Sequence, residues 1–324
     1  MSEVTRQSTV PSELAGERVD KIAAVLFDEF SRAALQGWIQ AGALTVDGQQ
    51  VKPKIRLLGG ETLRLDARLE AKEDWQTAEP VPFDVIYEDA DLLVINKPAG
   101  VVVHPGAGNP RGTLVNGLLN YRRSLELVPR AGIVHRLDKN TSGLLLIAAD
   151  LAAHKRLVDA LQERRIARTY AALVEGVMVG GQDIDRPIGR DPVRRTLQRI
   201  RADGREALTR VRVVKRYRSH TLISAALETG RTHQIRVHLS SISHPLVGDS
   251  RYGARGRLPT GADPQTIRLL QSFTRQALHA ERLDFEHPGS GAPMSFQTPP
   301  PTDLQTLIEA LDNDASMHRG DGRA

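Results

Sequence analysis

The chain has 324 residues, of which 40% are hydrophobic and 26% charged, proportions typical of a folded globular protein. It contains no cysteine, which excludes disulfide bonds and thiolate metal sites and fits a reducing cytoplasm. It has no apolar run long enough to span a bilayer, and its polar start does not resemble a secretory signal, so we expect a cytoplasmic protein without membrane contact.

The net charge of +5 is concentrated in one segment. Residues 186–218 contain twelve basic and three acidic residues, a net charge of +9, so the remainder of the chain is net −4. Eleven of the twelve are arginine, whose planar guanidinium suits phosphate recognition. A solvated surface of long side chains is the alternative. We favour contact with nucleic acid, with four candidate residues: Arg190, Arg194, Arg195 and Arg199.

Residues 1–16 are polar and are expected to form a disordered tail. Residues 17–66 are expected to form a small domain. Apolar residues at helical spacing predict a first helix from Arg18, and Ser31 is a suitable N-cap for a second. Short strands should follow, the first ending in an Asp-Gly turn. Residues 67–82 are charged and without pattern, which predicts a linker.

From residue 83 to residue 310, short apolar runs alternate with turns, and helical periodicity recurs only intermittently, as in residues 153–164. This pattern predicts an α+β catalytic domain on a large, mostly antiparallel mixed β-sheet with flanking helices and a central cleft. The strand-like runs are residues 91–96, 132–134, 144–148, 170–174 and 222–227. Residues 311–324 are expected to form a second disordered tail.

The most distinctive stretch is residues 131–148, in which two apolar runs flank a polar loop that begins at Asp138. A loop held between buried strands can present one carboxylate at a fixed position, as a nucleophile requires. The alternative is that Asp138 only caps its own turn, as aspartate often does. The residue pattern alone leaves both interpretations open.

Two further stretches contain candidate site residues. Tyr170 lies in an alternating strand-like run, where it is either a core residue or a platform for a stacked base. Arg231 lies at a predicted corner between a strand and a helix, where side chains point into clefts. His233 and His238 are five residues apart, a spacing that does not place both on one helical face, so we interpret them as structural and expect no metal.

Five segments, in order, resemble the RluA-type family of pseudouridine synthases. They are INKPAGVVVHPG (95–106), HRLDKNTSG (135–143), ARTYAALVEG (167–176), LETGRTHQIRVHL (227–239) and RQALHAERLDFEHP (275–288). The resemblance implies an isomerase in which Asp138 is the essential nucleophile, Tyr170 stacks on the target base, and Arg231 is the basic residue that pairs with Asp138 and favours its charged form. It also implies that Arg136 occupies the space left by a flipped base, although a structural salt bridge is an equal alternative.

Residues 17–66 resemble an S4 RNA-binding domain, with Val19 where such domains more often have leucine. Candidate RNA contacts in this part are Ser31, Arg32, Lys52 and Lys54. An S4 module before such a catalytic domain is similar to family members that modify the large ribosomal subunit. This similarity implies that the partner is a stem-loop of 23S ribosomal RNA, or the large subunit that contains it, and that no small-molecule cofactor is needed. We expect a monomer.

Two other classes of function remain to be compared with this interpretation. A metal-dependent RNA hydrolase needs clustered carboxylates, whereas the loop supplies one acid, Asp138, next to Lys139. A non-catalytic ribosome-assembly factor needs only the S4-like module and the basic segment, and it leaves Asp138, Tyr170 and Arg231 without a role. Incubation with uridine-labelled RNA in the absence of metal separates the three classes. An isomerase converts uridine at constant product mass, a nuclease shortens the chain, and a binding protein changes nothing.

Overall fold

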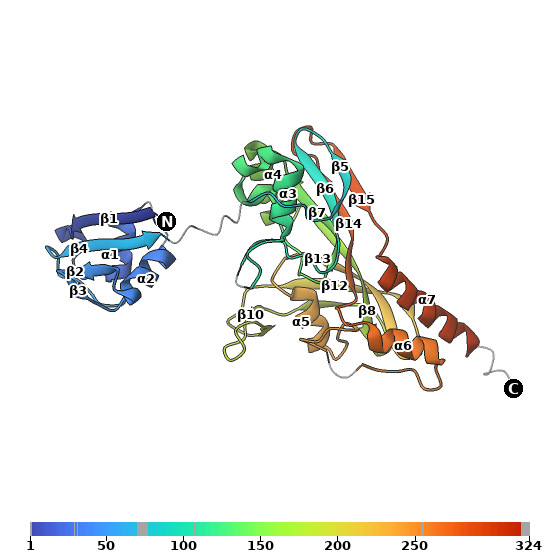
Figure 1. Cartoon of the computed structure of the whole chain (residues 1–324). Coiled ribbons are helices and arrows are strands. Elements are labelled where there is room, and N and C mark those ends of the chain that lie inside the picture. Colours follow the sequence, from blue (N-terminus) through green and yellow to red (C-terminus); the bar gives the residue numbers. More distant parts are fainter. Residues whose placement is uncertain are drawn as a thin grey trace. The chain divides into compact units, whose positions relative to one another are not determined.

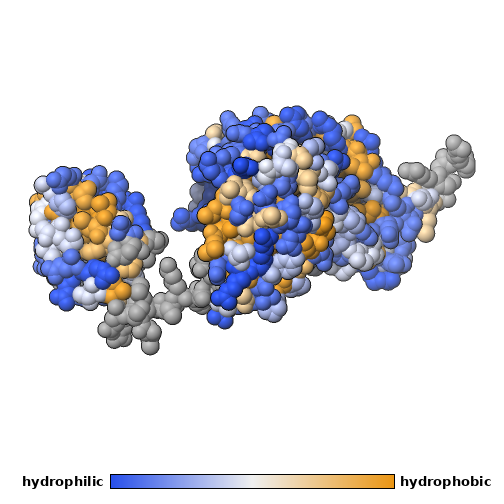
Figure 2. Space-filling model, turned by 90° about the horizontal axis from the view of Figure 1, so that it is seen from above, coloured by the Kyte–Doolittle hydropathy of each residue, from blue (hydrophilic) through white to orange (hydrophobic). Residues whose placement is uncertain are grey.

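The computed structural model describes residues 2–28, 30, 32–69, 77–106, 108–253 and 256–318 (Figure 1). The chain divides into two compact units, Met1–Asp74 and Trp75–Ala324, and the division falls inside the stretch expected to be a linker. Within the described residues, no helix combines the length and apolar character needed to cross a bilayer. The face of the larger unit seen in Figure 2 is mostly hydrophilic, with scattered hydrophobic residues.

The smaller unit packs two helices against a four-stranded sheet. Its elements are α1 (Val19–Leu26), α2 (Arg32–Ala41), β1 (Ser2–Thr9), β2 (Leu44–Val46), β3 (Gln49–Gln50) and β4 (Thr62–Leu69), with the strand order β1-β4-β2-β3. Ile22, Leu35 and Leu65 are fully buried between the two layers. The periodic apolar positions of the sequence are therefore the positions that form this core.

The predicted disordered tail over residues 1–16 is wrong for Ser2–Thr9. These residues form β1, which pairs antiparallel with β4 along its whole length, from Ser2↔Leu69 to Thr9↔Thr62. A paired edge strand needs backbone hydrogen bonds but few apolar side chains, so its polar composition conceals it. β4 also extends into the first three residues of the predicted linker, whereas residues 70–76 lie outside the described part.

A buried carboxylate ties α1 to α2. Asp20 is 0% exposed and accepts hydrogen bonds from Arg18, from Arg32 at 2.8 Å and from Gln36 at 2.5 Å. Burial by itself would raise the pKa of Asp20, but the hydrogen bonds from Arg32 and Gln36 outweigh it and lower the pKa to about 2. Arg32 is therefore held by a structural ion pair, and Ser31 lies outside the described residues.

The larger unit is built on a nine-stranded sheet with the order β5-β6-β7-β14-β8-β13-β12-β9, to which β15 adds by pairing with β14. The strands are β5 (Asp84–Glu88), β6 (Leu92–Lys97), β7 (Ser142–Ala148), β8 (Ala167–Glu175), β9 (Gln182–Asp185), β12 (Leu208–Arg216), β13 (His220–Leu227), β14 (Leu278–Glu286) and β15 (Pro293–Gln297). Only β7 and β14 pair in parallel, which confirms the predicted mixed, mostly antiparallel α+β fold.

Helices cover both faces of this sheet. One face packs α3 (Leu114–Tyr121) and α5 (Gln234–Ser241) around the main core. The other face is covered by α4 (Leu151–Gln162) and, in a separate cluster, by α6 (Pro264–Ser272) and α7 (Thr302–Met317), which lie side by side in Figure 1. Because alternate residues of a strand face opposite sides, the two faces of β8 contribute to different cores.

Two local predictions need correction. Residues 132–134 are not a strand, because the chain makes a 3₁₀ turn over Pro129–Gly132 and only Ile133 bridges, to Ile147. The predicted tail over residues 311–324 is wrong for its first part, since α7 continues to Met317 and buries Leu311. Residues 319–324 lie outside the described part.

A fully buried lysine connects the end of β6 to the loop before β7. Lys97 is 0% exposed, and its Nζ donates hydrogen bonds to the carbonyls of Pro98 (2.7 Å), Val101 (2.9 Å) and Lys139 (3.1 Å). Burial lowers the pKa of Lys97 to about 7, although the nearby charge of Asp138 opposes the shift. The Lys97 amine therefore binds the backbone carbonyl of Lys139, next to Asp138, and its pKa of about 7 means that it loses its proton close to neutral pH.

The buried amine leads to a testable pH dependence. Between about pH 7 and pH 10 the unfolded chain keeps the proton on Lys97 and the folded protein has released it, so folding becomes more favourable as pH rises. Relative to Lys97→Met, the wild type should gain roughly 1.4 kcal/mol of unfolding free energy per pH unit in this window. Urea unfolding of both proteins at pH 7 and pH 9 measures the difference. A difference independent of pH would mean that the amine keeps its full charge in the folded state.

Candidate active site

The loop that presents Asp138 is held rigidly from several sides. A turn closes it, in which the backbone N–H of Thr141 donates to the carbonyl of Asp138 at 3.1 Å, and the Gln276 side chain donates to Thr141 Oγ1, also at 3.1 Å. Gly143 then enters β7 with φ +116°, where a Cβ would lie 2.3 Å from the carbonyl oxygen of Ala280. Only glycine allows β7 and β14 to approach this closely. The position of Asp138 is therefore fixed by the backbone.

The carboxylate of Asp138 is clamped by Arg236, from the first turn of α5. Arg236 Nη1 donates to Asp138 Oδ2 at 2.9 Å, while its Nε and Nη2 donate to the two oxygens of Asp249 at 2.7 and 2.8 Å. The side chain of Arg236 is only 6% exposed and that of Asp138 16%. Among the described residues, no hydrogen bond reaches the second oxygen of Asp138, so Oδ1 remains free to react.

Arg231 does not pair with Asp138, contrary to the prediction. Its Nε donates instead to the backbone carbonyl of Glu206 at 3.0 Å. The physical reason lies in the start of α5, where His233 takes a left-handed conformation (φ +58°) and reverses the chain just before Gln234. Arg231 is left on the turn outside the helix, and Arg236 on the helix faces the loop.

His233 and Tyr252 complete the surroundings of Asp138. His233 Nε2 lies 3.9 Å from Asp138 Oδ1, and its Nδ1 lies 2.7 Å from the hydroxyl of Tyr252. The guanidinium of Arg236 lies over the Tyr252 ring, 5.0 Å from its centre. Burial lowers the pKa of His233, so its ring is neutral near pH 7. We predicted that both histidines are structural. This fits His238, whose two ring nitrogens are both hydrogen-bonded, whereas His233 lies beside Asp138.

Tyr170 lies on β8 and is 5% exposed, within the main core. Burial raises the pKa of its hydroxyl, and the charge of Asp138 raises it further, while Arg168 opposes the shift. Tyr170 therefore packs in the core, as the first of its two interpretations has it, and the charge of Asp138 still acts on its hydroxyl. Its phenol remains protonated at neutral pH, so it can stack or donate a hydrogen bond but is a poor base.

The basic segment is neutralised unevenly. Contacts within the described residues pair six of its cations with carboxylates: Arg199, Arg201, Arg210, Arg212, Lys215 and Arg218. Four of the carboxylates lie outside the segment, namely Asp183, Glu228, Asp312 and Asp314. On the hairpin of β10 (Ile188–Arg190) and β11 (Gln198–Ile200), the described contacts give Arg190 and Arg195 no acidic partner, whereas Arg194 lies beside Asp191, which accepts its backbone N–H at 2.8 Å and whose pKa its charge helps to lower.

The hairpin is joined to the surroundings of Asp138. The backbone N–H of Gln198 donates to the Tyr252 hydroxyl at 2.8 Å, the same hydroxyl that contacts His233. Arg199 is less available than its neighbours, because its Nη1 lies 4.0 Å from Asp191. Arg136, two residues before Asp138, is exposed and has no acidic partner among the described residues, so the contacts give no support to the salt-bridge alternative.

In the smaller unit, Lys52 and Lys54 are exposed and have no acidic partner among the described residues. They are available for an anionic ligand, unlike Arg32, which is held by Asp20. No local pattern in the sequence separates these cases, because the partner of Arg32 lies twelve residues away on another helix.

One cluster in the described residues has the composition of a metal site, namely Asp89, Asp91 and His287. Both oxygens of Asp89 already accept hydrogen bonds, from the Tyr87 hydroxyl, from His287 and from backbone N–H groups. His287 Nδ1 accepts from two backbone N–H groups, so its Nε2 carries the proton that it shares with Asp89. The cluster is a structural tie between β5 and β14.

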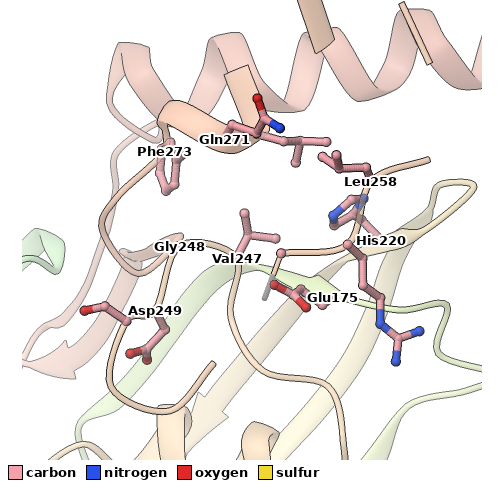
Figure 3. A pocket seen from close by; sticks show the side chains of 12 residues that line it. Glu175, His220, Val247, Gly248, Asp249, Leu258, Gln271 and Phe273 are labelled. Carbon is pink, nitrogen blue, oxygen red and sulfur yellow. The ribbon is translucent and has the colours of Figure 1, made fainter. Parts of the chain in front are cut away.

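A cavity of about 400 Å³ lies on the far side of Asp249 from the clamp. In Figure 3, Phe273 and Leu258 lie on opposite sides of it, with Val247 between them. It also contains His220, which is 0% exposed, and Glu175, whose pKa is raised by burial. None of Asp138, Tyr170 and Arg231 lines this cavity, so the cavity and the clamped carboxylate are separate features that share Asp249.

Comparison with known proteins identifies the family of this chain. Residues 91–241 match the family model described as RNA pseudouridylate synthase. The chain is 47% identical over 317 residues to a protein of Vibrio parahaemolyticus named ribosomal large subunit pseudouridine synthase D, covering 98% of this chain and 97% of that protein. It is 48% identical to the Pseudomonas aeruginosa protein of the same name, covering 98% and 99%.

Among solved structures, human RNA pseudouridylate synthase domain containing 1 is similar with a TM-score of 0.55 and 26% identity, covering 72% of this chain and 89% of that one. The matched family segment contains Asp138 and Arg236, which the tertiary structure brings into contact, and Tyr170, whose pKa the charge of Asp138 helps to raise. The chain belongs to the pseudouridine synthase family and is an RNA pseudouridine synthase.

Proposed function

We propose that this enzyme isomerises specific uridines in a stem-loop of 23S ribosomal RNA, with Asp138 as the nucleophile. The observation that carries the proposal is a single carboxylate whose Oδ2 is held by Arg236 and whose Oδ1 has no hydrogen bond among the described residues. The substrate is inferred from relatives named for the large ribosomal subunit. The reaction moves C1′ from N1 to C5 of the uracil and replaces the C5 proton by one on N1, so it needs no cofactor, metal or redox partner.

Asp138 is suited to hold the intermediate. Arg236 stabilises the charged carboxylate and orients it, so that Oδ1 can attack C1′ of the ribose or C6 of the base. When the carboxylate forms an ester and loses its charge, Arg236 keeps Asp249 as a counter-ion and is not left unpaired in the interior. The clamp therefore tolerates both charge states of the nucleophile.

The target base has to leave its stack to reach Asp138, at a cost of a few kcal/mol in typical cases. The family resemblance assigns stacking on the uracil ring to Tyr170, which is 5% exposed and whose hydroxyl is affected by the charge of Asp138. Arg136 is exposed two residues before Asp138, so it is placed to enter the gap left in the RNA. Because the Tyr170 phenol stays protonated, removal of the C5 proton falls to another group, such as the released Asp138 carboxylate or water.

Exposed cations on two surfaces support binding of a folded RNA. The β10–β11 hairpin carries Arg190 and Arg195, which have no acidic partner among the described residues, with Arg194 and Arg199 beside Asp191. The smaller unit, with two helices on an antiparallel sheet and exposed Lys52 and Lys54, is proposed to be an S4-type RNA-binding domain. The monomeric state and the cytoplasmic location remain predictions of the sequence.

Asp138→Asn should abolish isomerisation while leaving RNA affinity nearly unchanged, because the amide keeps the size of the carboxylate but is not nucleophilic. Turnover should fall by roughly 10⁴-fold or more, the scale on which loss of a nucleophile acts. Release of tritium from 5-tritiated uridine in the stem-loop measures it, with Asp203→Asn on the exposed surface as the matched control. Turnover of Asp138→Asn near the wild-type rate would overturn the proposed function.

The clamp predicts a contrast between two arginines. Arg236→Met leaves Asp249 buried without its partner and should cost about 3–5 kcal/mol of stability together with the activity. Arg236→Lys keeps one charge but cannot serve two carboxylates, so it should fold and lose most of its kcat. Arg231→Ala loses one bond to a carbonyl and should retain more activity than Arg236→Lys. Urea unfolding and steady-state kinetics check this, and the opposite order would restore Arg231 as the functional residue.

The hairpin predicts a specific dependence on salt. If Arg190, Arg194 and Arg195 contact phosphates, changing all three to Gln should flatten the log–log slope of RNA affinity against salt by roughly two to three units. The matched control is the triple change of Arg201, Arg210 and Arg212, whose guanidiniums are already paired with carboxylates. Titrations at several salt concentrations compare them, and equal slopes for both triples would return the hairpin to a solvated surface.

A further inference from the structure

A second buried arginine, Arg168, lies near the site and is not part of the clamp. It is the second residue of β8, hydrogen-bonded in register with Leu227 of β13 and Leu283 of β14, and it is 7% exposed. Its side chain leaves the same face of the sheet as Tyr170, because residues two apart on a strand point the same way. The two side chains are therefore about 6–7 Å apart along β8.

The guanidinium of Arg168 has no counter-ion in the described part of the chain. No carboxylate lies within ion-pair distance, no hydrogen bond engages its nitrogens, and Nε is sealed from solvent without an acceptor. Arg236 provides the comparison, since it is 5% exposed yet satisfied by two carboxylates. A buried charge without a partner is strongly destabilising, so such a residue usually meets its partner in a ligand.

The surroundings favour an anion at this place. His135 is neutral, because burial lowers its pKa to about 3 and the charge of Arg168 pushes in the same direction. Tyr170 is also neutral. Nε alone is sealed, so Nη1 and Nη2 are the atoms that a ligand can reach. They lie against Gly230, where a Cβ would be 2.7 Å from Nη1, and the absence of a side chain at Gly230 leaves the guanidinium its position.

We propose that Arg168 binds a phosphodiester group of the RNA next to the target uridine, and that it is a positioning residue for that nucleotide. The inference rests on the proposed function and deepens it. A guanidinium with two accessible terminal nitrogens matches two oxygens of one phosphate. The step along β8 from Arg168 to Tyr170 is comparable with the separation of a nucleotide's phosphate from its own base. Strand β8 would thus bind the phosphate through Arg168 and the base of the same nucleotide through Tyr170, the next residue on that face.

Arg168→Met removes the charge and fills the space, so its effect on RNA can be separated from its effect on folding. RNA affinity should fall about ten- to hundredfold, as expected for a charge-assisted contact, and the salt slope should flatten by about 0.7–0.9. Unfolding free energy should stay equal or rise, because an unpaired buried charge has been removed. KM should change more than kcat. Arg282→Met on the neighbouring strand is the matched control, because Arg282 is exposed and already paired with Asp284.

Single neutral phosphates identify the contact. In stem-loops with one methylphosphonate on either side of the target uridine, the wild type should lose affinity at one position, and Arg168→Met should lose nothing further there. Gly230→Ala, which crowds the guanidinium, should reproduce the loss in part. Equal sensitivity of wild type and Arg168→Met to every methylphosphonate, with a lower stability of the variant, would make Arg168 a structural residue. Turnover of the same RNA by the wild type is measured in parallel. If the wild type forms pseudouridine, the proposed function holds and only the role of Arg168 has been rejected.

Discussion

The site depends on one guanidinium shared between two carboxylates. Arg236 holds Asp138 with one nitrogen and Asp249 with two, in surroundings where an unpaired charge is costly. Burial works to raise the pKa of Asp249, but the bonds from Arg236 outweigh it and keep that carboxyl charged. Three segments, the 138–141 loop, α5 and the turn after residue 248, are thereby fixed to each other by side chains.

The backbone makes this clamp possible. Lys97 and Gln276 hold the loop that carries Asp138, and the glycine at position 143 allows β7 to lie in parallel against β14. His233 begins α5 in a left-handed conformation, which turns Arg236 rather than Arg231 toward the loop. Asp138 is therefore placed by elements that come from four distant parts of the chain, as a preorganised site requires.

The cationic groups of the larger unit fall into two kinds. Arg236 and half of the cations of the basic segment are paired with carboxylates of the protein itself, and they serve the fold. Arg168 and the hairpin residues Arg190 and Arg195 lack such partners among the described contacts, and in the complex that we propose an RNA backbone would supply them. The net charge of a segment is thus a poor measure of its affinity for RNA, because pairing depends on residues far away in sequence.

The sequence by itself determined the elements whose signal is local. The apolar runs of β7 and β8, the helical spacing in α4 and α5, and the polar loop at Asp138 follow from side-chain periodicity and turn chemistry. The order of motifs gave the family. The polar strand β1 gave no such signal, because its pairing with β4 uses backbone groups. The resemblance assigned the pairing with Asp138 to Arg231, whereas the structure gives it to Arg236, five residues later in the same motif. Only the tertiary structure decided that choice, because the left-handed turn at His233 sets the direction of α5 and Asp249 supplies the second carboxylate from another segment.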